Sequence, residues 1–381
     1  MIVRNEEENL RACLTSIHPH VEEVIVVDTG STDGTLQIAR EFAHKVVIYD
    51  CENTNEGGAR RGQLMNFSNA RNLSFFLASK PWVMWLDGDD IVRGGENLAG
   101  IVHGLQTTGA GDNYACSVSL PYEYDKIGDK VVSLQTRERI FSPKRCFEWR
   151  EPVHEVCCYR PEGGLPLLQR QYSEVVIEHR RRHLKSKNVP PERNLNILEA
   201  HYNSGARDAR TLHYYGMELS HARRFGHAND ILQQHMQVST WDDERMMSLL
   251  RIIDNFEAEE NWAAMLAWSL RAQCLMESWP ESYECLMRAY YWIGMAYNNP
   301  RDWQRCIHFG KLALSMPLPR SPLATNPMIY KKIHEFLNVA CARAGDVKGA
   351  LESAREIGHR NAGVLSDSTN MDLPNYQAAA Q

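Results

Sequence analysis

The sequence predicts an α/β domain followed by an all-α domain of helical repeats. Over the first hundred or so residues, short apolar runs of strand length alternate with segments whose apolar residues recur at helical spacing. After Pro190-Pro191 the strand pattern disappears, and the chain becomes rich in Ala, Leu, Met, Trp and Tyr at helical spacing. We therefore expect an α/β domain over residues 1–185, a helical domain over 186–360 and a flexible tail over 361–381.

The first domain is expected to contain a mostly parallel sheet with helices on both faces. Its predicted strands are 1–3, 24–27, 46–48 and 82–86, and its predicted helices are 8–17, 36–42 and 66–79. Strands separated by helices of this length are typical of parallel sheets, because each helix returns the chain to the same edge. Short strands with polar interruptions are expected to extend the sheet in an antiparallel or mixed manner, at 118–120, 131–134, 139–141 and 175–177.

Weak internal repetition in the second half predicts stacked helical hairpins. Small residues recur at intervals that bracket the lengths of helical-hairpin repeats, at Ala228, Ala264, Cys306 and Ala350. Gly294-x-x-Tyr297, followed by Ala313 and Pro317, resembles a tetratricopeptide unit. A compact helical bundle is the alternative. Five tryptophans of this half are expected mainly in the core rather than in a binding groove: Trp262, Trp268, Trp279, Trp292 and Trp303.

Composition and charge exclude several classes of protein. With 43% hydrophobic and 24% charged residues, the chain is neither disordered nor fibrous, and it has no apolar run long enough to span a membrane. The net charge of −6 gives no sign of nucleic-acid binding, and a basic run at 180–187 is typical of a solvated connector. The sequence shows no signal peptide, and its ten cysteines form no CxxC motif, so we expect a cytoplasmic protein.

Three carboxylates, those of Asp87, Asp89 and Asp90, crowd the end of the predicted strand 82–86. Like charges at this density repel one another, so a divalent cation that prefers oxygen ligands, Mn²⁺ or Mg²⁺, would compensate them. Such a cation could bridge a diphosphate and stabilise the departing group. A strand-end turn whose aspartates cap a helix is the alternative.

Two further polar segments are expected near this acidic cluster. Asp28, at the tip of strand 24–27, can accept hydrogen bonds from a base or a ribose, or it can simply form an Asx-type turn. Arg71, in the helix that precedes strand 82–86, could reach a phosphate or clamp an aspartate of the cluster. Ligands of parallel sheets bind at the carboxyl ends of the strands, so we expect these loops at one edge.

Four sequence blocks together resemble the inverting family 2 glycosyltransferases. In chain order they are Val3-Arg4-Asn5-Glu6-Glu7, residues 26–35, Asn69-Ala70-Arg71-Asn72 and Leu86-Asp87-Gly88-Asp89-Asp90. The resemblance implies a GT-A fold, a nucleotide-diphosphate sugar as donor and a Mn²⁺ or Mg²⁺ ion. It places Asp28 on the base, Asp87 near the ribose and the metal, and Asp89 on the metal. The other expected donor-binding residues are Val3, Asn5, Glu6, Gly30, Asp33 and Arg71.

A later block resembles one branch of this family. Residues 137–141 and the segment Trp149-Arg150-Glu151-Pro152-Val153-His154-Glu155 are similar to a branch that includes bacteriocin S-glycosyltransferases and lipopolysaccharide-type glucosyltransferases, several with tetratricopeptide-like tails. Ile177-Glu178-His179 resembles the histidine strand that follows. Inversion requires a base that deprotonates the acceptor. The expected base is Glu155, with Glu151 and Asp90 as rivals. His154 or His179 is expected as a third metal ligand or a diphosphate contact.

The predicted function is metal-dependent hexosyl transfer with inversion, from a nucleotide-diphosphate sugar to a hydroxyl or thiol, with a UDP-sugar favoured. The acceptor expected first is a protein or peptide side chain, because helical repeats present concave surfaces to peptides; they can also form homodimers. Alternative acceptors are a saccharide or lipid-linked glycan and a modified DNA base. A non-catalytic nucleotide-sugar-binding scaffold is a further alternative. The glycine-rich segment 52–62 could be a lid over the donor or a surface loop.

Overall fold

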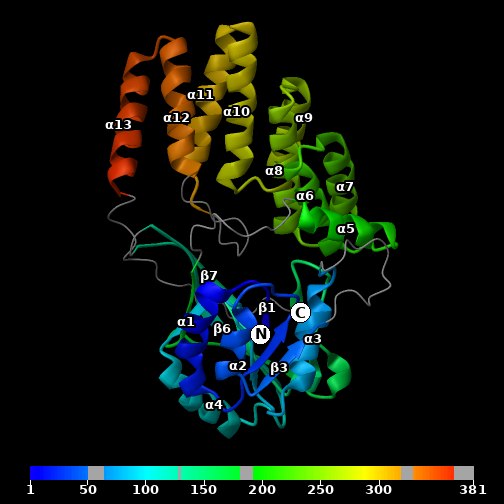
Figure 1. The fold of residues 1–381 in the computed structure, drawn as a ribbon. Helices are drawn as coiled ribbons and strands as arrows, with labels where there is room; N and C mark the ends of the chain where they lie inside the picture. Colours follow the sequence, from blue (N-terminus) through cyan, green and yellow to red (C-terminus); the bar gives the residue numbers. More distant parts are fainter. Residues whose placement is uncertain (50–63, 128–129, 181–191, 319–328, 364–381) are drawn as a thin grey trace. The chain divides into compact units, whose positions relative to one another are not determined.

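The computed structural model describes residues 1–49, 64–127, 130–180, 192–318 and 329–363. The chain forms two compact units, Met1–Ala200 and His201–Gln381 (Figure 1). The expected order, an α/β domain followed by an all-α region, is confirmed. Several expectations lie outside the described residues: the boundary between residues 185 and 186, the segment 52–62, most of the tail 361–381, and the basic run 180–187 apart from its first residue.

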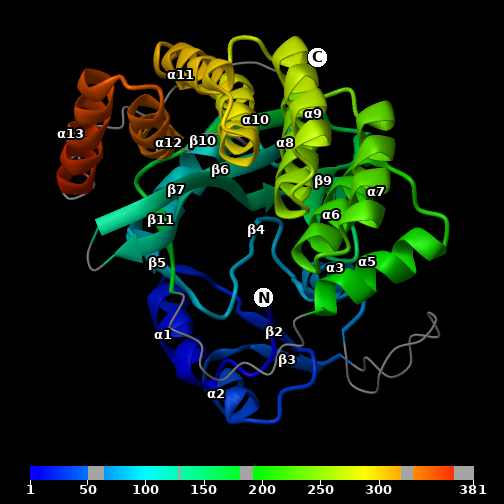
Figure 2. The same cartoon turned by 90° about the horizontal axis from the view of Figure 1, so that it is seen from above.

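The first unit opens with a parallel sheet of three strands in the order β1-β2-β3. The strands are β1 (Ile2–Val3), β2 (Ile25–Asp28) and β3 (Lys45–Ile48), and the helices among and after them are α1 (Glu7–Ile17), α2 (Thr35–Phe42) and α3 (Phe67–Leu77). Helices α1 and α2 pack on the sheet face formed by Val3 and Val26. Helix α3 packs on the opposite face, against Ile2 and Val27 (Figure 2). This sheet is therefore covered on both faces, as the sequence predicted.

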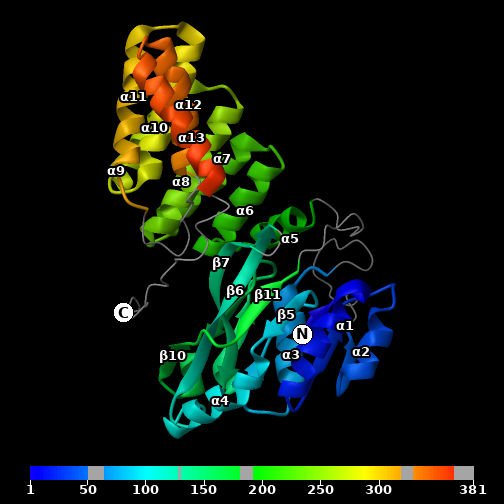
Figure 3. The same cartoon turned by 90° about the vertical axis from the view of Figure 1, so that its left-hand side faces the viewer.

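A second, mixed sheet of six strands corrects the expectation of one continuous sheet. Its order is β4-β7-β6-β11-β5, and β10 pairs with β6. The elements are β4 (Val83–Met84), β5 (Asp90–Arg93), α4 (Leu98–Thr107), β6 (Ala115–Ile127), β7 (Lys130–Ser142), β10 (Leu167–Gln171) and β11 (Val176–His179). The short strands predicted at 118–120, 131–134 and 139–141 belong to the long antiparallel ribbon β6–β7 (Figure 3). The two strands continue through the polar residues that interrupt the apolar pattern, because their backbones remain paired there.

The predicted strand 82–86 was wrong in length and in pairing. It is reduced to β4, which pairs antiparallel with β7 rather than joining the parallel sheet. The reason is the tight turn that follows: Asp90 N donates to Asp87 O at 3.2 Å and Asp87 N donates to Asp90 Oδ2 at 3.0 Å. The turn sends the chain back at once as β5, a strand that the sequence did not predict.

A two-stranded hairpin, also not predicted, completes the first unit. It consists of β8 (Phe147–Arg150) and β9 (Val156–Tyr159), paired antiparallel. Residues 151–155 form the loop that joins the two strands, and Glu151 and His154 have the positive φ angles of a tight loop, 72° and 55°. The ring of Trp149 packs in the core beside Phe75 and Trp85, which anchors the hairpin to α3 and β4.

The second unit is entirely helical in its described residues. Its helices are α6 (Ala209–His221), α7 (Phe225–Val238), α8 (Asp242–Ala258), α9 (Trp262–Leu275), α10 (Pro280–Tyr297), α11 (Pro300–Leu314), α12 (Ile329–Arg343) and α13 (Val347–Gly363); α5 (Arg193–Asn203) spans the division between the units. Consecutive helices pack as the pairs α6/α7, α8/α9, α10/α11 and α12/α13, as Figure 2 shows. The expected tetratricopeptide-like succession of hairpins is therefore present.

Glycine allows close helix contact within two of these hairpins. A Cβ atom on Gly216 would lie 2.5 Å from Leu232 of the paired helix, and one on Gly294 would lie 3.0 Å from the ring of Trp303. Of the five tryptophans expected mainly in the core, Trp279 and Trp303 are buried, and Trp262, Trp268 and Trp292 are half-buried and pack against a core cluster. Among the described helices, none combines the length and the apolar character that crossing a membrane requires.

Candidate active site at the carboxyl ends of the strands

Hydrogen bonds join the loop after β1 to the loop after β2. Val3 pairs with Asp28, so the two loops leave the sheet at the same edge. Asn5 Oδ1 accepts a hydrogen bond from Thr32 N at 2.8 Å, and Glu6 N donates to Thr35 Oγ1 at 2.7 Å. The sequence-predicted residues of the first two blocks are thus brought together.

Asp28 forms the Asx-type turn that the sequence left as an alternative, and it keeps one oxygen unused. Its Oδ1 accepts hydrogen bonds from Gly30 N and Ser31 N, both at 2.9 Å, and Gly30 has a positive φ of 101°. Oδ2 is buried and has no hydrogen-bond partner among the described residues. A buried acceptor without a partner costs about 1–3 kcal/mol, which a ligand N–H would recover.

Asp33 uses its carboxylate locally. Its Oδ1 accepts a hydrogen bond from Thr35 N at 3.0 Å, and its Oδ2 accepts one from Glu7 N at 3.3 Å. These bonds hold the start of α2 against the start of α1. Asp33 therefore shapes the loop, and its expected contact with a donor stays a prediction.

The turn after β4 gathers the acidic cluster. Asp90 is fully buried, and its Oδ2 accepts hydrogen bonds from Asp87 N at 3.0 Å and from Arg139 Nη1 at 2.9 Å. Gly88 brings the turn against the first loop, because a Cβ atom there would lie only 2.8 Å from Glu6 Cγ. The glycine of the Asp-Gly-Asp sequence is thus required by the approach of Glu6.

Arg71 links the acidic turn to the β8–β9 loop. Its Nη2 donates to Asp87 Oδ1 at 2.8 Å and its Nε donates to Glu155 Oε1 at 2.6 Å, while the side chain is only 8% exposed. The guanidinium lies 4.7 Å from the ring of Trp85 and 4.9 Å from that of Trp149. Of the two roles that the sequence allowed for Arg71, the structure therefore shows the clamp on an aspartate.

The carboxylates of the site differ in their electrostatic surroundings. Burial raises the pKa of Asp87, but Arg71 and Arg139 outweigh it and lower that pKa to about 2. The carboxylate of Asp89 pairs with no arginine side chain among the described residues, and His179 Nδ1 lies 3.6 Å from its Oδ1. Burial, opposed by His179 and reinforced by nearby carboxylates, raises the pKa of Asp89 to about 6. The ionised form of Asp89 is therefore less stabilised by nearby positive charge than that of Asp87.

The cluster as a whole carries excess negative charge. Four carboxylates (Asp87, Asp89, Asp90 and Glu155) meet two guanidiniums (Arg71 and Arg139), and the remaining partner is His179. Although burial lowers the pKa of His179, its bond to Asp90 and the charges of the aspartates raise it overall. With a neutral imidazole, two negative charges remain uncompensated. A divalent cation would balance them.

The described residues provide ligand atoms for such a cation. Oxygen atoms of Asp89 and Asp90 and a ring nitrogen of His179 lie within 4.8 Å of one another. Carboxylate oxygens suit Mg²⁺ and Mn²⁺, and an added imidazole nitrogen favours Mn²⁺ or another transition metal. Asp87 Oδ2 also makes no hydrogen bond within the described part of the chain. The residues present therefore fit a divalent cation.

Two other candidate residues, Glu151 and His154, lie in the same β8–β9 loop as Glu155. The backbone carbonyl of Glu151 accepts a hydrogen bond from Ser68 Oγ, which ties the loop to the first turn of α3. His154 directly precedes Glu155, but it belongs to neither of the two groups of described residues whose atoms could hold a metal. Glu155 is 13% exposed, and its Oε2 has no hydrogen-bond partner within the described ranges.

The role of Arg139 was missed by sequence reasoning. It had been noted only as part of a block similar to the glycosyltransferase branch. Its neighbours give no local signal, because Arg137 and Glu138 precede it and only the following Ile140 and Phe141 are apolar. The partner, Asp90, is 49 positions away in the chain, and no local pattern reveals it.

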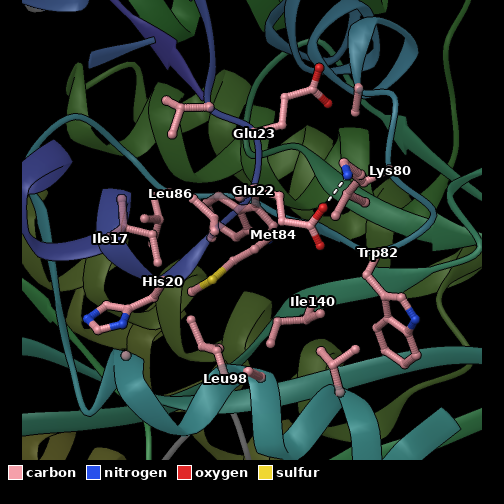
Figure 4. Close-up of a pocket in the computed structure, with 18 of the residues that line it drawn as sticks. Ile17, His20, Glu22, Glu23, Lys80, Trp82, Met84, Leu86, Leu98 and Ile140 are labelled. Carbon is pink, nitrogen blue, oxygen red and sulfur yellow. Dashed lines mark hydrogen bonds and ion pairs between the residues drawn. The ribbon is translucent and has the colours of Figure 1, made fainter. Parts of the chain in front are cut away.

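A separate cavity of about 810 Å³ lies elsewhere in the first unit (Figure 4). Residues at the starts of β2 and β4 line it, and its walls are mainly apolar, including Ile17, Met84, Leu98 and Ile140. None of the sequence-predicted site residues is among the described residues that line it. The candidate active site therefore does not coincide with this cavity.

Comparisons with known proteins identify the first unit. Residues 1–159 match the family model described as glycosyl transferase family 2. A TPR repeat-containing protein of Synechococcus elongatus is 39% identical over 90 residues, which cover 24% of this chain and 19% of that protein. The prophage-derived glycosyltransferase SunS of Bacillus subtilis is 29% identical over 92 residues, with the same two coverages.

A solved structure resembles the chain only distantly. MamA of Desulfovibrio magneticus is 16% identical and covers 47% of this chain and 89% of its own, with a TM-score of 0.36, which is too low to support an inference. The matches to the two curated relatives span 19% of the length of each, so they identify a domain and not a whole protein. The family match includes the acidic turn and Glu155, and residues 1–159 are therefore a domain of glycosyl transferase family 2.

Proposed function

We propose that the protein is a cytoplasmic, metal-dependent, inverting glycosyltransferase that uses a nucleotide-diphosphate sugar, with a UDP-sugar as the favoured donor. The observation that carries this proposal is the acidic cluster at the strand ends, whose carboxylates outnumber its guanidiniums. Within it, Asp89 has a partly buried carboxylate that lies beside His179 and that pairs with no arginine side chain among the described residues. A bound cation would balance this excess negative charge and would at the same time allow a negatively charged diphosphate to bind nearby.

The nucleoside is proposed to bind where the first two loops meet. Asp28 Oδ2 supports this placement, because it is a buried acceptor without a described partner and could accept an N–H of a base. Asn5 and Glu6 hold the same edge through their bonds to the loop after β2. In this proposal Val3 and Gly30 contribute backbone rather than side-chain contacts.

Asp89 and His179 are proposed to hold Mn²⁺ or Mg²⁺, with Asp87 nearby. When bound, the cation would neutralise the diphosphate and stabilise its departure. Asp87 is kept ionised by Arg71 and Arg139, so its free oxygen remains available at neutral pH. Asp90 is fully buried and engaged through both oxygens, so we assign it a positioning role instead of the base role considered from the sequence.

Glu155 is proposed as the general base, and Glu151 remains the rival. Arg71 fixes Glu155 through Oε1, which leaves Oε2 to take the proton of the acceptor hydroxyl or thiol. The acceptor atom then forms a bond to the anomeric carbon, and the bond from that carbon to the diphosphate oxygen breaks on the opposite side. This in-line displacement inverts the configuration. His154 is left as a donor contact in this scheme.

The proposed acceptor is a side chain of a protein or peptide. Two features support it: the branch that residues 137–155 resemble includes bacteriocin S-glycosyltransferases, and the second unit is a succession of helical hairpins of the kind that presents surfaces to peptides. The expected homodimer through the helical half and the domain boundary at residue 185 are kept as parts of this proposal.

Turnover of the donor tests the proposal. The purified protein is incubated with UDP-, GDP-, CDP- and TDP-hexoses, with Mn²⁺ or with a chelator. Water serves as the acceptor of the sugar, and the nucleotide diphosphate released by this hydrolysis is measured. We expect release from one donor, dependent on the cation and abolished in Asp89→Asn. Asp112→Asn, at an exposed loop position, is the matched control. Equal release by Asp89→Asn and by the wild type would refute the metal assignment.

A further inference from the structure

Arg139 is a fully buried arginine behind the acidic turn. It lies in β7, and its Nη1 donates to Asp90 Oδ2 at 2.9 Å; both side chains are 0% exposed. Its Nε and Nη2 have no hydrogen-bond partner among the described residues. Removing a guanidinium from water costs several kcal/mol, and the bonds of Nη1 to Asp90 Oδ2 and, at 3.4 Å, to Trp85 O compensate this only in part. A side chain held at such cost invites a functional explanation.

Two aromatic rings complete the surroundings of the guanidinium. Its central carbon lies 3.8 Å from the ring centre of Trp85 and 4.7 Å from that of Tyr122. Faces of aromatic rings attract cations without offering them a competing carboxylate. Trp85 itself is fixed, because its Nε1 donates to Glu138 O at 2.8 Å. The rings therefore hold Arg139 in place while its charge remains directed at Asp90.

Asp90, which Arg139 holds in place, contacts His179 in turn. Its Oδ2 is occupied by Arg139 and by Asp87 N, and its Oδ1 lies 3.2 Å from His179 Nδ1. The two residues also pair directly across β5 and β11. The same Nδ1 lies 3.6 Å from Asp89 Oδ1, so it faces two carboxylates. Because a carboxylate oxygen can only accept, a neutral imidazole that hydrogen-bonds Asp90 donates from Nδ1 and carries its lone pair on Nε2.

We propose that Arg139 is a positioning residue of the cation site, which acts through Asp90 to fix the tautomer and the orientation of the His179 ring. The inference rests on the proposed function, because His179 and Asp89 are the groups proposed to hold the cation. A carboxylate that accepts the second ring N–H of a metal-binding histidine raises its basicity and fixes its ring. In this protein the carboxylate is that of Asp90, and Arg139 in turn fixes the position of that carboxylate.

The position of the ring proton provides the first test, and it requires no cation. ¹⁵N NMR at alkaline pH, where imidazole is neutral, distinguishes a protonated from an unprotonated ring nitrogen. The signal of His179 is identified by its loss in His179→Gln. We expect a protonated Nδ1 and an unprotonated Nε2. A proton on Nε2 would overturn the proposal, and this measurement on the wild type stands even if variants of Arg139 fail to fold.

Binding of Mn²⁺ alone, measured by calorimetry, provides the second test. We expect Arg139→Met to weaken Mn²⁺ binding by about 10–100-fold, the usual effect of removing such an outer partner, and Arg139→Lys to restore part of it. Arg93→Met is the matched control: Arg93 lies in β5 near Asp90, is half exposed and pairs with Glu123 and Glu178. Unchanged affinity in a folded Arg139→Met protein would overturn the proposal.

The two tests separate this inference from the proposed function. If the wild type bound no Mn²⁺, the proposed metal site would fail, while the ring proton of His179 would still test the Asp90–His179 hydrogen bond through which Arg139 is proposed to act. If the wild type bound Mn²⁺ and Arg139→Met bound it equally well, the metal site would stand and the positioning role would fail.

Discussion

Arg71 holds Glu155 at 2.6 Å, from its Nε to Glu155 Oε1, and the same guanidinium holds Asp87 at 2.8 Å. The three residues come from α3, from the β8–β9 loop and from the turn after β4. This contact explains why sequence blocks far apart in the chain act at one place. In the proposed reaction it joins the base to the side of the site that binds the diphosphate.

Replacing Arg71 with lysine keeps the positive charge but removes the simultaneous hydrogen bonds to Asp87 and Glu155. A single ammonium cannot reproduce the geometry of a guanidinium that donates from two nitrogen atoms to two carboxylates. We expect Arg71→Lys to lower kcat by about 100-fold, in the range typical of a displaced acid–base group. Steady-state kinetics of donor turnover check this, with Arg288→Lys, another buried arginine, as the control. An unchanged kcat for Arg71→Lys would contradict the role of the clamp.

Replacing Glu155 with glutamine preserves its size and removes its capacity as a base. We expect kcat for transfer to fall by about 10²–10⁴-fold. The affinity for the nucleotide diphosphate should change little, because Glu155 is proposed to act on the acceptor and not on the donor. Glu151→Gln, examined in parallel, separates the two candidate bases. Equal losses of kcat and of donor affinity in Glu155→Gln would indicate a binding role instead.

Gly88 should tolerate no side chain. A Cβ atom there would meet Glu6 Cγ at 2.8 Å, so alanine must displace either Glu6 or the acidic turn. We expect Gly88→Ala to weaken binding of the nucleotide diphosphate by about tenfold, equivalent to about 1.4 kcal/mol. Gly100→Ala in α4 is the matched control, because its Cβ atom would meet nothing within 4 Å. Similar affinities for the two variants would argue against this packing.

Glu281 in α10 should make stability depend on pH. Burial penalises its ionised form and raises its pKa from 4.5 to about 7. Well below pH 4.5 the group is neutral in both states. Between pH 4.5 and about 7 it ionises in the unfolded state but stays neutral in the folded state, which favours unfolding, and above about 7 the effect levels off. We expect the free energy of unfolding to fall over this interval, by at most about 3 kcal/mol.

Glu281→Gln should remove this decline. The measurement is the thermal midpoint of the wild type and of the variant between about pH 4.5 and 8, and the informative quantity is their difference at each pH. The advantage of the variant should grow with pH. A difference that stays constant across the interval would show that Glu281 does not titrate abnormally.

The sequence predicted the first parallel sheet well because β1, β2 and β3 depend on local signals. Their apolar runs are short and are followed by turn residues and helices, and these patterns are readable without knowledge of tertiary contacts. Strands β5, β8, β9 and β10 were missed. Each has only four or five residues; β5 and β10 pair with segments distant in the chain, and β8 and β9 pair with each other across a five-residue loop.

The candidate site was predictable in its residues but not in its pairings. Asp87 and Asp89 follow a strand end and stand out by charge alone. The choice between a clamp and a phosphate contact for Arg71 could not be made, since Glu155 lies 84 positions away. The burial of Asp90 was equally hidden, because it depends on Arg139 and on the rings around it.

The most direct test of the whole account is calorimetry of UDP, GDP, CDP and TDP, each with and without Mn²⁺, against the wild type and Asp89→Asn. The account predicts that one nucleotide, with UDP favoured, binds tightly only with Mn²⁺, and that Asp89→Asn loses this dependence. Binding of none of the four nucleotides under either condition would contradict a donor site at the strand ends.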